Sequence, residues 1–355
     1  MDWNLIWIIF TLLFSGCSFL SFIDSQHWFF RFFEYTRLQL FGILIGLFIA
    51  FLFLEHKLAA INLIVVLFLI LVILHNLSIL YPYFPRYKRR MTTSSNGISL
   101  LSFNVNQENS AYDRVVQLIR QIKPDLILTM ETDKKWERAL SKIESDYKYS
   151  VKIPLENRYG MHFYSKLPIL KYQKHCLISE EAPSVEVMLR DHDNNDFVFW
   201  GIHPPPPSPT EKPSSKQKDG ELMMLAKLIC EIELPVIVAG DFNNVCWSPI
   251  TKLFLNITKL HDARVGKGFS STFPAMLPGF LRFPIDLVFH SKTVLIHKLK
   301  VLSSIGSDHF PLFSKFSIIP FTLETKNKIL SSQKEEMKEK IKLGKEAAKE
   351  ENGPE

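Results

Sequence analysis

The fold is decided by the stretch Pro235-Val236-Ile237-Val238-Ala239-Gly240-Asp241-Phe242-Asn243. Its four apolar residues, three of them β-branched, predict a strand that is buried on both faces. Asp241 and Asn243 follow two residues apart, and residues at that spacing in extended chain project to the same side. A carboxylate and an amide therefore point together from the end of a buried strand. An ordinary capped turn looks the same, so the question is whether other polar groups reach this place.

The first 85 residues predict an all-helical transmembrane region. No charged residue occurs between Asp2 and Asp24, between Arg37 and Glu55, or between Lys57 and Arg86. A spanning helix needs about 20 mostly apolar residues. We therefore expect about three helices, at about 4–23, 38–54 and 58–80, which makes the lipid bilayer a partner and the protein a multi-pass membrane protein.

The positive charges around these runs predict an orientation. A basic and polar linker at 86–97 begins with Arg86 and follows the third run, and Arg31 and Arg37 lie on the same side of the membrane. Only Lys57 is on the other side. The positive-inside rule places the rest of the chain tentatively in the cytoplasm. An exoplasmic domain stays open as the alternative, because interfacial arginines can mislead this count.

Composition favours few specific partners. The net charge is +6, too small to favour nucleic acid, for which a pronounced basic patch is expected, although that partner stays open. The cysteines after the apolar region form no metal-spaced cluster. The segment 204–218, rich in Pro, Ser and Lys, predicts an extended loop. The tail at 321–355, dense in Lys and Glu, predicts a charged helix or disorder. No protein partner follows from these features.

Residues 98–320 predict an α/β domain in which polar side chains follow buried strands. Short apolar runs alternate with amphipathic stretches, the clearest helices being 112–122 and 221–232. Functional groups in such domains gather where strand ends meet loops. The predicted strands 98–103, 126–130, 197–202 and 235–239 lead into Asn104, Glu131, His203 and Asp241, while Asp286 lies near the start of strand 285–289 and Ser307-Asp308-His309 precedes strand 312–318.

These residues resemble, in order and approximate spacing, the motifs of the endonuclease/exonuclease/phosphatase superfamily, the DNase I-like fold. The resemblance is carried by Asn104, Glu131, Gly240-Asp241-Phe242-Asn243, Ile285-Asp286 and Ser307-Asp308-His309, and Tyr164-Ser165-Lys166-Leu167-Pro168-Ile169 resembles the superfamily's central strand and turn. It covers about residues 98–318. It implies a four-layer α/β sandwich, two packed β-sheets flanked by helices. The preceding spans and a His-Pro-Pro loop resemble the bacterial membrane-anchored, YafD-like branch, which implies the inner membrane.

The resemblance also implies a chemistry, hydrolysis of a phosphoester by an activated water with Mg²⁺ or Mn²⁺ as cofactor. Glu131 would be the principal metal ligand, with Asn104 and Asp308 beside it, since hard divalent ions take oxygen ligands. Asp241 would orient or deprotonate the water, and Asn243 would donate its amide to the phosphate or to that water. In the same way His309 would contact the phosphate as a cation oriented by Asp286, and His203 would be a donor to the phosphate or the leaving group.

Several departures and alternatives accompany this interpretation. The family often has Gln before the metal-binding Glu, where this chain has Met130, and Arg158-Tyr159-Gly160 corresponds only loosely to an aromatic phosphate-contacting site. Asn104 and Asp286 have an alternative use as turn caps, and His203 as an ordinary loop residue.

Three functions are therefore weighed. The first is a membrane-anchored phosphodiesterase or phosphatase acting on phospholipid or lipid-linked substrates. A metal-dependent endo- or exonuclease is the alternative. A catalytically inactive membrane scaffold or binding protein is the third, and the intact set of acidic residues and His309 argues against it.

Overall fold

A computed structural model describes residues 2–55, 59–86, 97–319 and 329–352. The chain divides into two compact units: Met1–Phe84 with Pro207–Ser215, and Pro85–Pro206 with Lys216–Glu355. Most of the predicted linker 86–97 and the first part of the predicted tail lie outside the described residues.

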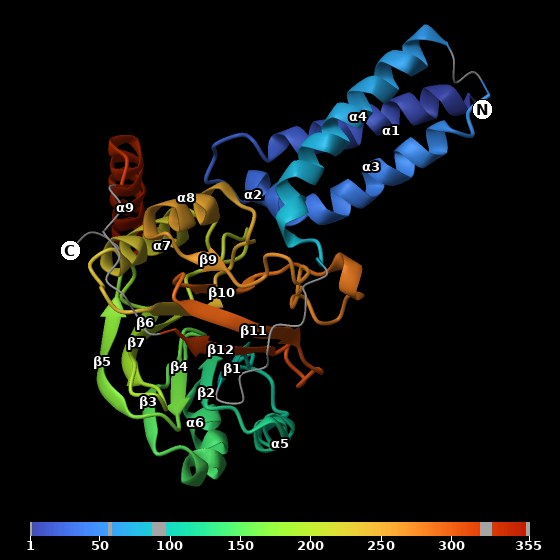
Figure 1. Ribbon diagram of the computed structural model, residues 1–355. Coiled ribbons are helices and arrows are strands. Elements are labelled where there is room, and N and C mark those ends of the chain that lie inside the picture. The colour runs from blue at the N-terminus through green and yellow to red at the C-terminus, as the bar shows by residue number, and fades with distance from the viewer. Residues whose placement is uncertain (1, 56–58, 87–96, 320–328, 353–355) are drawn as a thin grey trace. The chain divides into compact units, whose positions relative to one another are not determined.

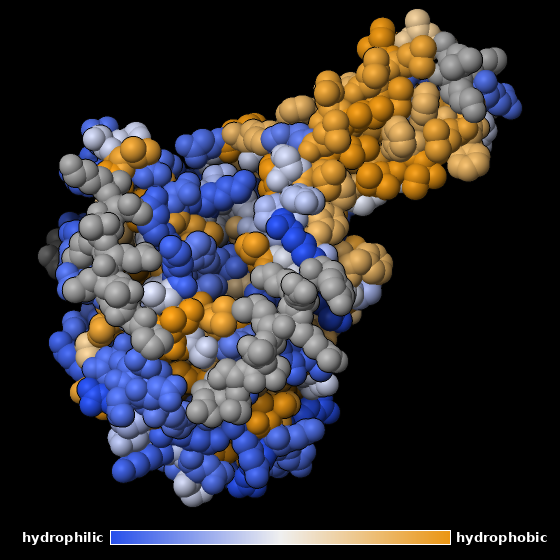
Figure 2. All heavy atoms as spheres, viewed as in Figure 1, coloured by the Kyte–Doolittle hydropathy of each residue, from blue (hydrophilic) through white to orange (hydrophobic). Residues whose placement is uncertain are grey.

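The first unit is helical (Figure 1) and consists of α1 (Trp3–Leu20), α2 (Trp28–Tyr35), α3 (Arg37–Phe51) and α4 (Ala60–Leu80), which continues into the 3₁₀ turn η1 (Tyr81–Tyr83). Apolar side chains cover these helices in Figure 2. Two helical runs, Trp3–Leu20 and Ala60–Tyr83, are long and apolar enough to cross a membrane, and the pair α2 and α3, bent by 61°, makes a third only if it is one span. The predicted second span thus ends earlier than expected: α3 has 15 residues, fewer than the about 20 that a straight span needs.

Arg31 of α2 and Arg37, the first residue of α3, form polar contacts inside this unit. Arg31 forms an ion pair with Glu34 at 2.7 Å, and its Nε donates to Ser215 Oγ at 3.2 Å. Arg37 donates to Asn76 Oδ1 at 3.0 Å and to Ser21 Oγ. Both side chains are buried. Because buried arginines pair with specific partners, these two charges have a structural use apart from any role in setting the orientation.

The second unit contains two six-stranded sheets (Figure 1). The first has the order β11-β12-β1-β2-β4-β3 and the second β5-β6-β7-β8-β10-β9. The first sheet comprises β1 (Ile98–Asn104), β2 (Leu126–Met130), β3 (Tyr149–Ile153), β4 (Met161–Ser165), β11 (Val294–Val301) and β12 (Leu312–Ile318). The second comprises β5 (Ile169–Cys176), β6 (Pro183–Arg190), β7 (Asp196–Ile202), β8 (Val236–Asp241), β9 (His261–Asp262) and β10 (Asp286–His290). Among the strands that the structure describes, β1 with β2 and β7 with β8 pair in parallel, and the other pairs are antiparallel.

The sheets face each other across one apolar core, and helices lie outside them. Inward-facing residues of both sheets form this core, as where the rings of Phe163 and Phe199 stack at 4.8 Å. Helices α5 (Tyr112–Ile122) and α6 (Lys134–Leu140) pack on the outer face of the first sheet. Helices α7 (Lys216–Ile229) and α8 (Pro249–Thr258) flank the second sheet. The predicted four-layer α/β sandwich is confirmed.

One helix begins earlier than predicted, and part of the tail adopts the helical one of its two predicted alternatives. Helix α7 begins at Lys216 rather than at residue 221, so the end of the predicted extended loop 204–218 is helical. Residues Ser331–Asn352 form α9, which packs on α7 and buries Met337. A Cβ on Gly220 would lie 3.0 Å from the Cα of Gly344, so the two glycines let the backbones touch. A glycine inside a helix lowers its propensity, which hid this contact from the sequence pattern.

Candidate active site

The strand ends predicted to carry function meet at one rim of the inter-sheet core. Side chains alternate along a strand, and Asn104 continues the inward-facing row of β1 that includes Leu100. In the second sheet Asp241 lies opposite Asp286, because β8 and β10 pair in that register. The amide of Asn104 lies 3.3 Å from Asp241 Oδ2 and so joins the two sheets.

An oxygen-rich group surrounds Glu131. Asn104 Nδ2 donates to Glu131 Oε1 at 2.7 Å, and the N–H of Gln107 donates to Oε2 at 3.2 Å. Asn106 Nδ2 donates to Asp308 Oδ1 at 3.1 Å, which places that carboxylate in the same group. Burial raises the pKa of the Glu131 carboxyl, while the Asn104 hydrogen bond acts against this rise. A cation close to these oxygens would stabilise the charged form.

Asp241 is 1% exposed and lies between two histidines. Its Oδ2 is 3.5 Å from His309 Nε2 and 3.8 Å from His203 Nε2, and its Oδ1 accepts the N–H of Asn243 at 2.9 Å. Burial raises the pKa of the Asp241 carboxyl, opposed in part by His309. A carboxylate with a raised pKa is a better proton acceptor. The Asn243 amide donates one hydrogen to Pro204 O at 3.0 Å, which fixes the side chain against the end of β7.

The two histidines are set to opposite charge states. Burial works against a cation on His309, but Asp286 and Asp241 outweigh it and raise its pKa to about 10. The closest contact is His309 Nδ1 to Asp286 Oδ2, at 2.9 Å. Burial lowers the pKa of His203, which favours the neutral ring. His309 is therefore the cation of the site, and His203 is a neutral donor or acceptor.

The donor set fits a divalent cation. The carboxylates of Glu131, Asp241, Asp286 and Asp308 gather around one imidazolium, so negative charge is in excess. Asp241, Asp286 and His309 each offer one ligand atom within 4.8 Å of the others. Asp286 Oδ1 is buried with no hydrogen-bond partner among the described residues. Hard divalent ions prefer such oxygen ligands.

Three hydrogen bonds of the site, made by Ser307 and Met130, were not predicted from the sequence. Ser307 Oγ donates to Asn104 O at 2.8 Å and accepts the N–H of His309 at 3.0 Å, so one hydroxyl connects the end of β1 to the loop before β12. Met130 stands where the family often has Gln, and its sulfur accepts the N–H of Asp241 at 3.0 Å. Nothing in the local sequence signals the Met130–Asp241 and Ser307–Asn104 contacts, since each joins segments more than 100 residues apart.

Ring contacts line the site beside the histidines. The ring of Tyr159 lies 5.4 Å from that of His203, and the ring of Phe273 lies 4.7 Å from that of His309. The loose resemblance at Arg158-Tyr159-Gly160 thus falls next to the site. Phe273 belongs to the long connection between β9 and β10 and carried no motif.

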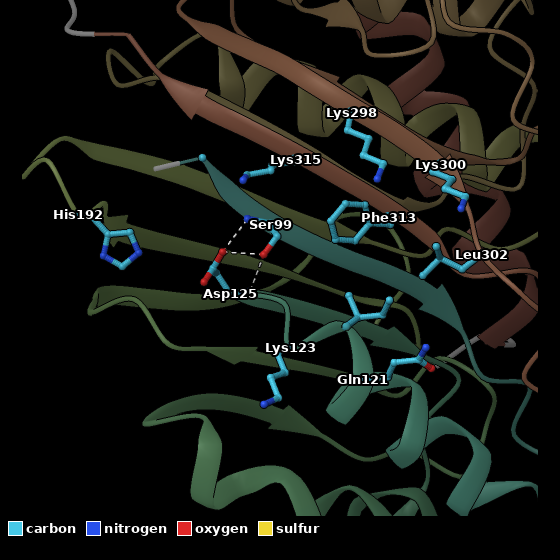
Figure 3. A pocket seen from close by; sticks show the side chains of 12 residues that line it. Ser99, Gln121, Lys123, Asp125, His192, Lys298, Lys300, Leu302, Phe313 and Lys315 are labelled. Atoms are coloured by element: carbon cyan, nitrogen blue, oxygen red, sulfur yellow. Dashed lines mark hydrogen bonds between the residues drawn. The ribbon is translucent and has the colours of Figure 1, made fainter. Parts of the chain in front are cut away.

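A separate recess of about 780 Å³ lies on the outer face of the first sheet (Figure 3). Lysine side chains from the turn before β2, from β11 and from β12 line it, together with one histidine: Lys123, Lys298, Lys300, Lys315 and His192. Its acidic member, Asp125, is engaged by Ser99 through the N–H at 2.8 Å and the hydroxyl at 2.6 Å. None of the predicted site residues lines this recess, so it is a second, basic surface.

Solved structures share the fold at low sequence identity. An endonuclease/exonuclease/phosphatase from Bacteroides vulgatus matches with a TM-score of 0.52 and 17% identity, over 62% of this chain and 99% of that one. The human nocturnin catalytic domain with bound sulfate matches with a TM-score of 0.50 and 16% identity, over 66% and 99%. D. rerio TDP2 with a single-stranded DNA product matches with a TM-score of 0.50 and 15% identity, over 63% and 100%.

Sequence comparison leads to a family. No curated protein matches the chain. The model of the Endonuclease/Exonuclease/phosphatase family matches residues 101–309, more than half of the chain. That range runs from β1 to His309 and includes every predicted site residue. The chain therefore belongs to the endonuclease/exonuclease/phosphatase family.

Proposed function

We propose that this protein is a membrane-anchored, divalent-metal-dependent phosphoester hydrolase that acts through an activated water on a phospholipid or lipid-linked substrate. The observation that carries the proposal is the buried Asp241, which lies between His203 and His309 and 3.3 Å from Asn104. Such a group brings a proton acceptor, a cationic donor and oxygen ligands to one place, as phosphoester hydrolysis requires.

Glu131, Asn104 and Asp308 would hold the metal, Mg²⁺ or Mn²⁺. When bound there, the ion would neutralise charge that develops on the phosphoryl oxygens. His309 is less suited to this task, because its Nδ1 is engaged by Asp286 and a protonated ring has no lone pair to offer a metal.

The remaining side chains would handle the substrate and protons. Asp241 would accept a proton from the attacking water, since burial raises the pKa of its carboxyl. His309 would donate from Nε2 to a phosphate oxygen, oriented by Asp286 through the other nitrogen. His203 would donate to the phosphate or the leaving group. Asn243 would donate its amide to the phosphate or to the attacking water.

Membrane attachment supports a lipid substrate. The apolar helical runs Trp3–Leu20 and Ala60–Tyr83 would keep the site close to a bilayer, where phospholipid headgroups are concentrated. The protein would be a multi-pass protein of the bacterial inner membrane, and the basic residues after Tyr83 favour a catalytic unit in the cytoplasm. A reporter enzyme fused to the C-terminus, active only on one side of the membrane, tests this orientation.

Nuclease activity is the second candidate, and the basic recess favours it. Lysines attract phosphate backbones, and four of them line the recess in Figure 3. Strand β1 carries Ser99 in the recess and ends at Asn104 in the site, so one strand contributes to both. The similarity to TDP2 with its DNA product points the same way.

The test uses the full chain in nanodiscs with Mg²⁺, assayed against phospholipids, a soluble phosphodiester, and single- and double-stranded DNA. We expect hydrolysis of a phospholipid and a loss of about 10³-fold in Asp241→Asn and Glu131→Gln. Asp146→Asn, an exposed carboxyl in the 3₁₀ turn η2 (Ser141–Asp146), is the control. Preferred cleavage of DNA would favour the nuclease, and failure to cleave any substrate with metal bound would favour the scaffold.

A further inference from the structure

An exposed apolar loop lies beside the site. The connection between β9 and β10 contains residues 274–283, which we call the apolar loop, with the 3₁₀ turn η3 (Gly279–Leu281) at its tip. Met276 is 86% exposed, Phe280 72% and Leu281 36%. Large apolar side chains grouped on a surface mark a contact with a partner or a membrane. The loop is therefore an interaction surface beside the site.

The loop is fastened to the site residues. The N–H of Ala275 donates to Asp308 O at 2.6 Å, and the N–H of Phe310 donates to Thr272 O at 3.0 Å. The Phe273 ring packs on His309 at 4.7 Å. A molecule that binds the apolar loop is thus held next to Asp308 and His309.

The loop also has an ordered interior. The backbones of Phe273 and Phe283 pair across its base, and the guanidinium of Arg282 donates to Leu277 O at 2.7 Å while it lies 4.1 Å from the ring centroid of Phe310. Its tip is consequently presented in a defined shape. A preorganised apolar tip binds at lower entropic cost than a mobile one.

The chemistry of this connection matches an anionic bilayer surface. From Ala263 to Ile285 there is no Asp or Glu, and the basic residues Lys267 and Arg282 are partly exposed, whereas Arg264 is buried. Cationic residues flanking apolar ones are typical of segments that lie at the headgroup level. A surface for an acidic soluble protein would not need the exposed apolar tip.

The chain itself leads from an apolar helix to this connection. Tyr83 ends the helical run Ala60–Tyr83, and three residues later the N–H of Arg86 donates to Gly266 O at 3.0 Å. A Cβ added to Gly268 would lie 3.8 Å from the ring of Pro85, so the two residues are close together. Only three positions along the chain therefore separate the last residue of this apolar helical run from a residue bonded to the base of the connection.

We propose that the apolar loop inserts into the headgroup–acyl boundary of the bilayer and presents a lipid phosphoester to the site. The insertion itself rests on the exposure, charge and connectivity of the loop. Its role in presenting substrate rests on the proposed function. Met276, Phe280 and Leu281 would contact acyl chains, and Arg282 would lie at the level of the lipid phosphates.

Insertion is tested without any enzymatic assay. The full chain, in a cysteine-free background with a single Met276→Cys, is labelled with an environment-sensitive fluorophore and placed in nanodiscs that contain phosphatidylglycerol and nitroxide-labelled lipids. We expect blue-shifted, quenched emission. A label at Asp193→Cys, in the exposed turn between β6 and β7, is the control and should stay water-like. Water-like, unquenched emission from position 276 would overturn the proposal.

A second arm tests what the loop does for the substrate. In Met276→Asp/Phe280→Asp we expect hydrolysis of bilayer phospholipid to fall by about a hundredfold or more, as the lost burial of two large apolar side chains predicts. Hydrolysis of the soluble phosphodiester should be unchanged. If cleavage of single-stranded DNA falls instead, the loop stacks on bases, which overturns the presenting role. If the label inserts but no variant or wild type cleaves any substrate, the proposed function fails and the insertion stands.

Discussion

The Asp286→Asn substitution tests how the site keeps a cation in a buried place. Asp286 Oδ2 lies 2.9 Å from His309 Nδ1, and both side chains are buried. The pKa of His309 is raised from 6.5 to about 10, a difference of about 3.5 units, which corresponds to about 5 kcal/mol. Asp286 is the largest favourable contributor and Asp241 the next. Burial remains in the variant, so we expect the pKa of His309 to fall to its ordinary range or below it.

The direction of the pH effect on kcat/KM depends on which protonation state of His309 is active. If the cation contacts the phosphate, wild type keeps this group active up to about pH 10, the raised pKa. The variant should lose kcat/KM as the pH rises through roughly 6.5, about tenfold per unit at the limit. The assay is a pH profile of kcat/KM on a soluble phosphodiester at saturating Mg²⁺, with Asp146→Asn as the control.

Two results would refute this reasoning. A variant profile parallel to that of wild type would show that Asp286 does not set the charge of His309. If the variant needs more Mg²⁺ than wild type for full activity and its pH profile at saturating Mg²⁺ is unchanged, Asp286 is a metal ligand and the metal site shifts toward Asp241 and His309.

Three further predictions concern stability and metal binding. Burial raises the pKa of Glu221 to about 8 from 4.5, so its contribution to stability is full below about 4.5 and is lost as the pH rises to about 8, at about 1.4 kcal/mol per unit; Glu221→Gln should flatten this slope in denaturant unfolding of the full chain. Gly240→Ala would place a Cβ 2.0 Å from Ile202 O at a φ of 150°, and we expect a loss of at least about 3 kcal/mol in the same measurement, with normal stability contradicting the contact. Removal of divalent ions by a chelator should lower the Tm of wild type by several degrees but leave Glu131→Gln nearly unchanged, whereas equal shifts would move the metal away from Glu131.

Strand positions were predictable because the core imposes a strong pattern. The runs at 126–130 and 312–318 are apolar on the buried side and became β2 and β12 with the predicted bounds. Polar residues at the ends of such runs stand out against the pattern. This contrast makes Glu131 and Asp241 recognisable as candidate site residues from the sequence alone.

Other parts of the structure depend on contacts that a local pattern does not contain. Helix α9 has few apolar residues, yet it packs on α7 because Gly344 meets Gly220. The sulfur of Met130 replaces an expected polar side chain by accepting a backbone N–H from the other sheet. In both cases the stabilising partner lies more than 100 residues away, and neither residue signals it alone.

The topology explains why four strand ends form one site. Each sheet has a parallel pair at its centre, β1 with β2 and β7 with β8, and each pair is connected through a helix, α5 or α7. Parallel strands end at the same edge of their sheet. Because the two sheets pack face to face, the two edges meet, and the inward-facing rows of β1 and β8 run on from core residues into Asn104 and Asp241. A shift of one residue in the register of β8 would turn Asp241 to the outer face. In the observed register Gly240 lies opposite Ile202 of β7. A Cβ at this position would lie 2.0 Å from Ile202 O, so the pairing that keeps Asp241 in the site needs a glycine here.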